Sequence, residues 1–201
     1  MSSDVDSTFI TAIIADPNGI SVAAAVGNNA ALVIGGALAS GGAVTFDHPR
    51  NVTILSAADD SGISFTVVGT DELGAAATES ITGANTDTAV GAQIFATIAS
   101  ITAVGDPAGN VTAGSGTTVA VTMFAGRMRL KGMYAVNTGT AGTITFRETS
   151  ATGNIRMQFN TCAAANSTEY PDIPDDGLLF KSGGYVVYTQ TTLSSLTVFY
   201  A

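Results

Sequence analysis

The sequence predicts an all-β protein with two small antiparallel β-sandwich or jelly-roll-like domains and a short N-terminal arm or helix. Apolar and polar residues alternate along many short segments, which is the period of a strand with one buried face. Threonine and valine are abundant, and 23 glycines interrupt these segments. The interruptions recur at about the 8–12-residue spacing expected of a sandwich or barrel.

The N-terminal segment is the exception to simple alternation. Phe9–Ala15 carries Ile10, Ile13 and Ile14 at helical spacing. The turn-forming run Asp16–Gly19 follows it. We therefore expect a short helix or arm at this end of the chain.

The apolar stretch Ile20–Leu38 has about the length of a membrane-spanning helix. A Gly-Asn-Asn run at residues 27–29 interrupts its centre, and these residue types favour a tight turn between strands. We therefore expect a hairpin in which Ile20–Val26 returns through Ala31–Ile34, and no membrane span.

Alternation predicts the later strands. Isoleucines in the segment 94–101 stand at helical spacing, but the neighbouring Thr and Ser residues favour a strand. Thr143–Arg147 and Ile155–Phe159 flank a turn-forming run, so they are expected to form a hairpin. Further alternating segments are Ile63–Val67, Tyr185–Thr189 and Leu196–Tyr200, and we expect the last to be packed in the second domain.

A domain boundary is expected at residue 118. The small residues of Ala113–Thr118 are typical of a flexible linker. Residues 1–118 contain one cation and eleven acids, a net charge of −10, whereas residues 119–201 contain six cations and five acids, a net charge of +1. We expect an acidic β domain at 1–118, with 1–19 as its arm, and a β-sandwich or jelly-roll domain at 119–201.

Charge and composition limit the partners. The net charge of −9 repels phosphate and anionic lipid, so neither nucleic acid nor a membrane is an expected partner. Only 11% of the residues are charged, against roughly 25% in an average domain. Such a chain is expected to bury surface against neighbouring subunits. Asp4 and Asp6 stand where a secretory signal carries cations, so secretion is not expected.

Catalytic and redox chemistry has little support in the sequence. His48 is the one histidine, and we expect it at the surface or at a subunit contact rather than as a catalytic base. Cys162 has no second Cys for a disulfide and no company for a zinc site, so a small buried residue is expected. Neither a nucleophile elbow nor a phosphate loop occurs. We therefore expect that the chain is not an enzyme and that it binds no cofactor.

A weak metal-site candidate lies in the segment 172–177, where Asp172, Asp175 and Asp176 supply three carboxylates. Calcium binds carboxylate and carbonyl oxygens in such loops. However, Ile173 and Pro174 break the alternation of an EF-hand loop, and Pro-Asp-Asp-Gly is a common turn. The turn is the favoured interpretation.

Three cations stand out in the second domain. Arg127, Arg129 and Lys131 alternate with Met128 and Leu130, so they are expected to share one face of a strand. One interpretation is a solvated or edge-protecting face. The other is a subunit contact with an acidic neighbour.

The order of several strand and turn motifs resembles proteins of the tailed-bacteriophage virion. The first half carries Pro49–Thr53, Asp60–Thr66, Gly69–Asp71, Thr78–Gly83 and Gly109–Thr112 in the order of a module of such proteins. The second half is similar to their C-terminal domains in Gly139–Phe146, Asp172–Pro174, Gly177–Phe180 and Leu196–Tyr200. These motifs extend over residues 49–201, and the first 48 residues carry none of them.

The resemblance implies a non-enzymatic virion protein, made in the host bacterial cytoplasm and bound to the capsid surface as cement or decoration. Its implied partners are the major capsid protein and copies of itself, with a homotrimer favoured. We expect the second domain to face the shell and the acidic domain to face solvent. A tail, head-fibre or neck component is the alternative.

A carbohydrate-binding module for host attachment is the rival from another class. Such a module needs exposed aromatic side chains. The chain has no Trp, and most Tyr and Phe residues alternate as expected core residues. The sequence therefore disfavours this rival.

Overall fold

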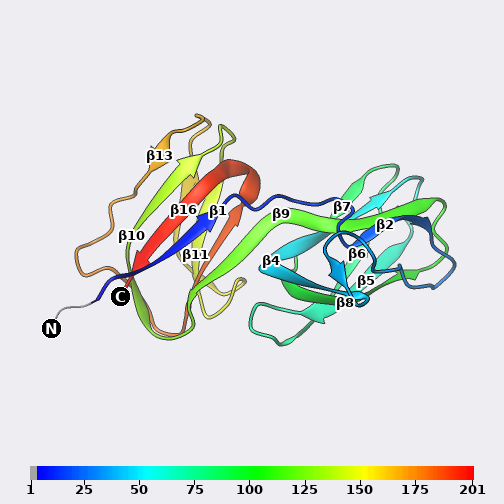
Figure 1. Ribbon diagram of the computed structural model, residues 1–201, viewed down its shortest axis with the longest axis horizontal. Coiled ribbons are helices and arrows are strands. Elements are labelled where there is room, and N and C mark those ends of the chain that lie inside the picture. The colour runs from blue at the N-terminus through cyan, green and yellow to red at the C-terminus, as the bar shows by residue number, and fades with distance from the viewer. Residues whose placement is uncertain (1–3) are drawn as a thin grey trace. The chain divides into compact units, whose positions relative to one another are not determined.

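The computed structural model describes residues 4–201, without the side chain of Gln190, and confirms the all-β prediction (Figure 1). Its sheets are antiparallel, and the helical structure described is one 3-10 turn, Gln190–Thr192. The strands are β1 (Asp6–Thr11), β2 (Ser21–Ala25), β3 (Ala39–Ser40), β4 (Ala43–Ser56), β5 (Ser64–Thr70), β6 (Ala76–Thr82), β7 (Thr88–Val90), β8 (Phe95–Val104), β9 (Asn110–Phe124), β10 (Met128–Asn137), β11 (Gly142–Glu148), β12 (Asn154–Thr161), β13 (Thr168–Glu169), β14 (Leu178–Phe180), β15 (Gly184–Thr189) and β16 (Leu193–Tyr200).

The chain divides into two compact units. Residues 4–14 and Thr118–Ala201 form one, which we call the discontinuous unit, and Ala15–Thr117 form the other, which we call the inserted unit. The division falls beside the expected boundary at residue 118, but the start of the chain groups with its second half. The predicted arm 1–19 is therefore shared between the units, and its residues 1–3 lie outside the described residues.

The discontinuous unit consists of two sheets. One has the order β1-β16-β10-β13, with β14 also paired to β10, and the other has the order β12-β11-β15-β9. β13 and β14 are counted here as one strand position, because both pair with β10. The first strand of the unit, β1, then lies beside the last, β16, and the second strand, β9, lies beside the last but one, β15. This is the strand order of a jelly roll.

A single hydrophobic core lies between these two sheets. The sheet of β1, β16 and β10 contributes Ile10, Leu196 and Leu130, all at most 2% exposed. The opposite sheet contributes Phe146 and Val186, both fully buried. Burial of each large apolar side chain stabilises the fold by about 1.5–3 kcal/mol.

A short helix or arm was expected over Phe9–Ala15, and the helix is wrong because residues 6–11 form a strand. β1 pairs antiparallel with β16 in unbroken register from Asp6–Tyr200 to Thr11–Ser195. This register points Ile10 into the core and leaves Phe9 65% exposed. The helical spacing of the isoleucines was misleading because Ile13 enters the core from the loop that follows the strand.

The inserted unit has its own core, and β9 contributes its first part to this unit and its last part to the discontinuous unit. Its main sheet has the order β9-β4-β8-β5-β6, while β2 pairs with β9, and β3 and β7 pair with β4. Its core includes Ile20, Phe65, Phe95 and Ile101, all fully buried. Its two ends are hydrogen-bonded to each other near their termini, because Asp16 N–H donates to Ser115 Oγ (2.9 Å) and Ser115 N–H donates to Asp16 O (2.9 Å). Adjacent ends are what an inserted domain requires.

The predicted hairpin between Ile20–Val26 and Ala31–Ile34 is wrong. β2 pairs with the start of β9, and Ala31 forms an isolated bridge with Thr102 of β8. The two apolar segments therefore find separate nonlocal partners rather than each other.

The expected flexible linker Ala113–Thr118 is also wrong, because this run lies within β9. A Cβ at Gly114 would lie 2.3 Å from the carbonyl oxygen of Asp16, and one at Gly116 would lie 2.3 Å from the Asn51 side chain. These glycines therefore permit close packing rather than flexibility.

Other strand predictions are confirmed. The segment 94–101 lies mostly in β8, and Thr143–Arg147 pairs with Ile155–Phe159 as the β11–β12 hairpin. Leu196–Tyr200 lies in β16 between β1 and β10. Val198 is fully buried there, as expected of a packed strand.

The pairing of β1 with β16 should make Ile10 a major contributor to stability. Replacing Ile10 with Ala is expected to lower the free energy of unfolding of the discontinuous unit by about 2–5 kcal/mol, since it removes buried methyl groups and leaves a cavity. Replacing the exposed neighbour Phe9 with Ala should change it by no more than about 0.5 kcal/mol. Urea denaturation followed by circular dichroism measures both; equal losses would contradict the register.

Candidate functional site

The three predicted contact cations do not form one free surface. Met128 and Leu130 are buried and Arg129 and Lys131 are half-exposed, so the expected alternation holds over these positions. Arg127 is exposed and precedes β10, and the register of β10 with β16 shifts between Leu130 and Gly132. Only part of the cationic set therefore belongs to a regular strand face.

The structure brings two of these cations against the segment 172–177, which we call the acidic loop. Arg129 Nη1 donates to the carbonyl oxygens of Asp176 (3.0 Å) and Gly177 (3.3 Å). Lys131 Nζ donates to the carbonyl oxygen of Asp175 (3.2 Å). β14 then pairs with the start of β10, which keeps the loop beside the same strand. The sequence analysis did not predict this contact, because Arg129 and Asp176 are far apart in the sequence.

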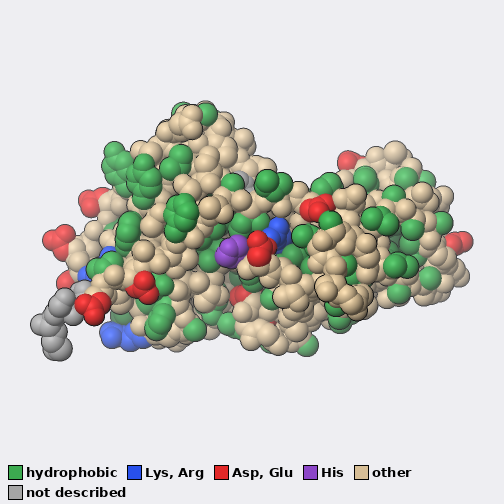
Figure 2. All heavy atoms as spheres, in the orientation of Figure 1, with side chains coloured by type: hydrophobic (Ala, Val, Ile, Leu, Met, Phe, Trp, Pro, Cys, Tyr) green, Lys and Arg blue, Asp and Glu red, His purple; other side chains and the backbone are tan. Residues whose placement is uncertain are grey.

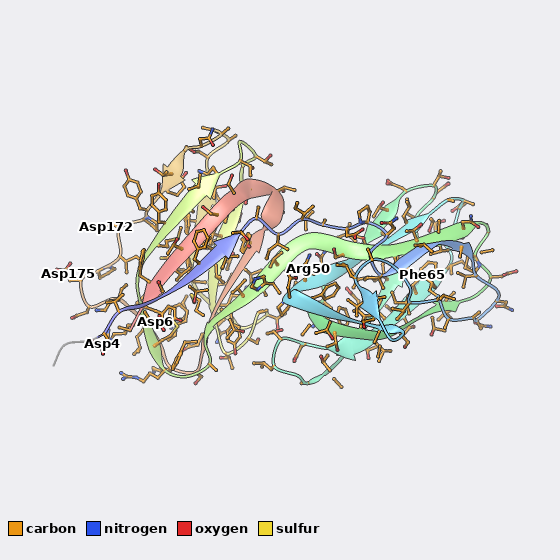
Figure 3. All side chains as sticks on the ribbon, in the orientation of Figure 1. Asp4, Asp6, Arg50, Phe65, Asp172 and Asp175 are labelled. Carbon is orange, nitrogen blue, oxygen red and sulfur yellow. The ribbon has the colours of Figure 1, made fainter. Side chains whose placement is uncertain are left out.

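The loop is a turn, as the favoured interpretation holds. Gly177 N–H donates to Pro174 O (2.6 Å), and Gly177 has a φ of 74°, a left-handed conformation that favours glycine. The backbone carbonyl oxygens of residues 175–177 accept hydrogen bonds from Arg129 and Lys131. Within residues 4–201, no group of three or more His, Cys, Asp or Glu side chains is arranged to hold a metal ion. Figure 3 labels Asp172 and Asp175 on this loop.

Two small cavities lie at the ends of β1 in the discontinuous unit. One, of about 150 Å³, is lined by Asp4, Asp6, Phe124, Met128, Tyr200 and Ala201. The other, of about 190 Å³, is lined by Ala12, Ile13, Ile14, Thr138, Thr191 and Leu193. Neither lining contains a nucleophile beside a base, so these cavities offer no catalytic pair.

Cys162 is exposed, so its expected burial is wrong. Its sulfur lies 2.9 Å from Ser167 Oγ, and its N–H donates to Glu169 Oε1 (3.1 Å). The fully buried Asn137 donates from Nδ2 to Ser167 Oγ (2.8 Å) and Glu169 Oε1 (3.3 Å). These bonds hold the segment between β12 and β13 against β10.

Hydrogen bonding changes the acidity of this cluster. Cys162, through its thiol and its N–H, and to a lesser extent Asn137, hold the pKa of Glu169 below its ordinary value. Separately, hydrogen bonds from the Ser61 hydroxyl and N–H lower the pKa of Asp59, in the segment between β4 and β5. Both carboxylates thus stabilise local backbone turns.

His48, the sole histidine, is half-buried in β4 of the inserted unit. Its backbone N–H donates to Asp47 Oδ1 (2.9 Å), and its backbone carbonyl oxygen accepts from Arg50 Nε (3.2 Å). Arg50 is 3% exposed and forms an ion pair with Asp47. The backbone of His48 thus takes part in a local arrangement around Arg50.

Sequence reasoning missed an exposed set of aromatic side chains. Phe9 is 65% exposed, Tyr134 is 44% exposed and Phe199 is 37% exposed, on β1, β10 and β16. We call these three residues the aromatic face. Tyr170, 71% exposed, directly follows β13, the strand beside β10. Figure 2 shows hydrophobic side chains on this part of the discontinuous unit.

The sequence signal for this face was ambiguous. Val198, Phe199 and Tyr200 are consecutive apolar residues, and only the register of β16 decides that Phe199 points outward. The premise that disfavoured carbohydrate binding, namely core positions for most aromatic residues, therefore fails for these side chains.

Comparison with known proteins gives no family assignment: no family model matches the chain, and no curated protein matches it. Across the described part of the chain, no helix has the length and hydrophobicity needed to cross a membrane.

Loss of the Arg129 side chain should loosen the acidic loop. In Arg129→Ala, the amides of residues 175–178 are expected to exchange hydrogen faster than in the parent chain, because two carbonyl contacts disappear. Arg127→Ala removes a nearby exposed cation without those contacts and serves as control. Hydrogen-exchange mass spectrometry measures both, and equal protection of the loop in the two variants would contradict its anchoring by Arg129.

Glu169 should give a pH-dependent contribution to stability. Because the folded-state pKa is lowered, ionised Glu169 stabilises the folded state above the ordinary carboxyl pKa, and this contribution is lost as the pH falls through the folded-state pKa. Glu169→Gln should therefore be less stable than the parent at neutral pH and should approach it in acid. Urea denaturation across this pH range measures the difference; a difference that grows in acid would refute the assignment.

Proposed function

We propose that this chain is a non-enzymatic structural protein of a tailed-phage virion, a capsid cement or decoration protein. The observation that carries the proposal is the jelly-roll strand order of the discontinuous unit, an architecture that recurs in viral capsid proteins. The order of the strand and turn motifs from Pro49 to Ala201 supports the same class. Fold alone does not specify function, because proteins with many different functions share a jelly roll. The motifs therefore restrict the proposal to virion proteins.

Charge supports an orientation for the bound protein. The inserted unit contains one cation and nine acids, a net charge of −8, whereas the discontinuous unit contains six cations and seven acids, a net charge of −1. Copies of an acidic unit repel one another and other acidic particles. We propose that the nearly neutral discontinuous unit docks on the shell and the inserted unit faces solvent.

Apolar burial is expected to supply most of the docking affinity, with cations tuning orientation and rate. Arg129 and Lys131 donate to the acidic loop of their own chain. Arg127 is exposed, and its side chain forms no hydrogen bond or ion pair with another described residue. Arg127 is therefore the member of the predicted cationic set most available to a carboxylate of the major capsid protein.

The position on the virion is tested by adding purified, labelled chain to shells that lack it and imaging the particles by cryo-electron microscopy. Decoration is expected on every facet, with copies of the chain grouped, in the favoured case, as trimers. Labelling at one vertex supports the tail, head-fibre or neck alternative. Failure to label shells or complete virions would overturn the virion proposal.

Reversing the charge of Arg127 should slow docking. An exposed ion pair contributes about 0.2–1 kcal/mol, so Arg127→Glu is expected to weaken shell binding by about 1.4-fold to fivefold at low salt. Lys181→Glu makes the same charge change at another exposed position of the discontinuous unit. Association kinetics at two salt concentrations measure both variants, and an equal effect of the two would show a general charge effect instead of a contact at Arg127.

A further inference from the structure

The outer surface of the sheet formed by β1, β16 and β10 is built from rings and hydroxyl groups. Along β1, Ile10 points into the core while Ser7, Phe9 and Thr11 alternate with the inward positions. Along β16, Ser195, Thr197 and Phe199 alternate in the same way with buried Leu196 and Val198. Tyr134 and Val136 supply the outward positions of β10.

The strand register gathers the three rings around one hydroxyl. Thr197 is opposite Phe9 on one side and Tyr134 on the other. Neighbouring strands lie about 4.8 Å apart, so the backbones at Phe9 and Tyr134 are separated by about 10 Å. Phe199 is opposite Gly132, and its ring lies close to this glycine, with Cδ2 3.7 Å from the position that a Cβ of Gly132 would take. The rings thus form a platform instead of a closed cluster.

The hydroxyl groups between the rings are available to a ligand. Ser7, Thr11, Ser195 and Thr197 have no side-chain hydrogen bond to another described residue. An apolar protein surface laid on this face would remove these groups from water without giving them partners, which is unfavourable. A ligand that carries its own hydroxyl groups replaces those lost bonds.

The distribution of charge further restricts the class of ligand. None of the outward residues of β1 and β16 named above is charged, and on β10 the cations Arg129 and Lys131 lie at the end occupied by the acidic loop. The whole chain carries a net charge of −9, which disfavours anionic polymers. In Figure 2, green hydrophobic side chains and tan atoms cover most of the part of the unit over β16 and β10, and red Asp or Glu side chains lie near its end.

We propose that this face binds an uncharged polysaccharide. The rings of Phe9, Tyr134 and Phe199 stack on the apolar faces of sugar rings, and the hydroxyls of Thr197, Ser195 and Ser7 hydrogen-bond to sugar hydroxyls. Tyr170, which follows β13 beside β10, extends the platform at one side. This activity does not rest on capsid binding, because it needs only the discontinuous unit of a single chain.

Affinity electrophoresis of the purified full-length chain tests this proposal. Native gels contain one of four soluble neutral polysaccharides (a β-1,3-glucan, a mannan, a dextran or hydroxyethylcellulose) or the anionic polymer alginate. At least one neutral polymer is expected to retard the chain, with little dependence on salt. Replacing Phe9 or Tyr134 with Ala should weaken that binding by about twofold to tenfold, the range expected for loss of one aromatic contact.

Ile155→Ala is the matched control, because Ile155 is 51% exposed on β12 in the opposite sheet of the same unit. It should bind like the parent. Near-ultraviolet circular dichroism establishes that each variant is folded, and Tyr134→Phe, which keeps the ring, should retain most of the affinity.

Three results overturn the proposal: no retardation by any neutral polymer, retardation unaffected by both aromatic substitutions, or binding only to alginate with strong salt dependence. Light scattering is run in parallel. If Phe9→Ala and Tyr134→Ala instead convert an oligomer into a monomer without changing retardation, the face is a contact between copies of the chain. Because shells are absent from this experiment, its outcome is independent of the virion proposal.

Discussion

The antiparallel ladder between β1 and β16 is the interaction on which the discontinuous unit depends. It joins a strand near the start of the chain to one near its end, and it places Ile10 beside Leu196 in the core. Without β1, the edge of β16 would present unpaired backbone groups to solvent, and Ile10 would lose its buried environment. The ladder thus completes both the sheet and the core.

This ladder brings together residues far apart in sequence, which carries an entropic cost that grows slowly with the length of the closed loop. The inserted unit lowers that burden, since the mutual hydrogen bonds of Asp16 and Ser115 already hold its two ends together. Close packing at Gly114 allows this approach. A folded insertion is therefore compatible with a jelly roll whose first strand precedes the insertion and whose second strand, β9, begins inside it.

The same ladder creates the surface that distinguishes this unit. Its register alternates Ile10 inward with Phe9 outward, and β16 in turn aligns Thr197 with Tyr134 of β10. An aromatic face assembled from three strands follows from the pairing that closes the core. The acidic loop and its cations are a separate consequence of β14 pairing with β10, which sets Arg129 beside Asp176. One sheet thus carries an uncharged surface over its middle and charged groups at one end.

The sequence by itself determined the all-β class and local pairs such as the β11–β12 hairpin, because alternation and turn residues act over a few positions. It also located the charge change near residue 118 and the turn at Gly177. Only the tertiary structure decided that residues 6–11 form a strand, that Gly114 is a packing glycine and that Phe9 and Phe199 face outward. The physical reason is that each of these outcomes depends on a nonlocal partner, and a strand's register with that partner decides which of its alternating sides is buried.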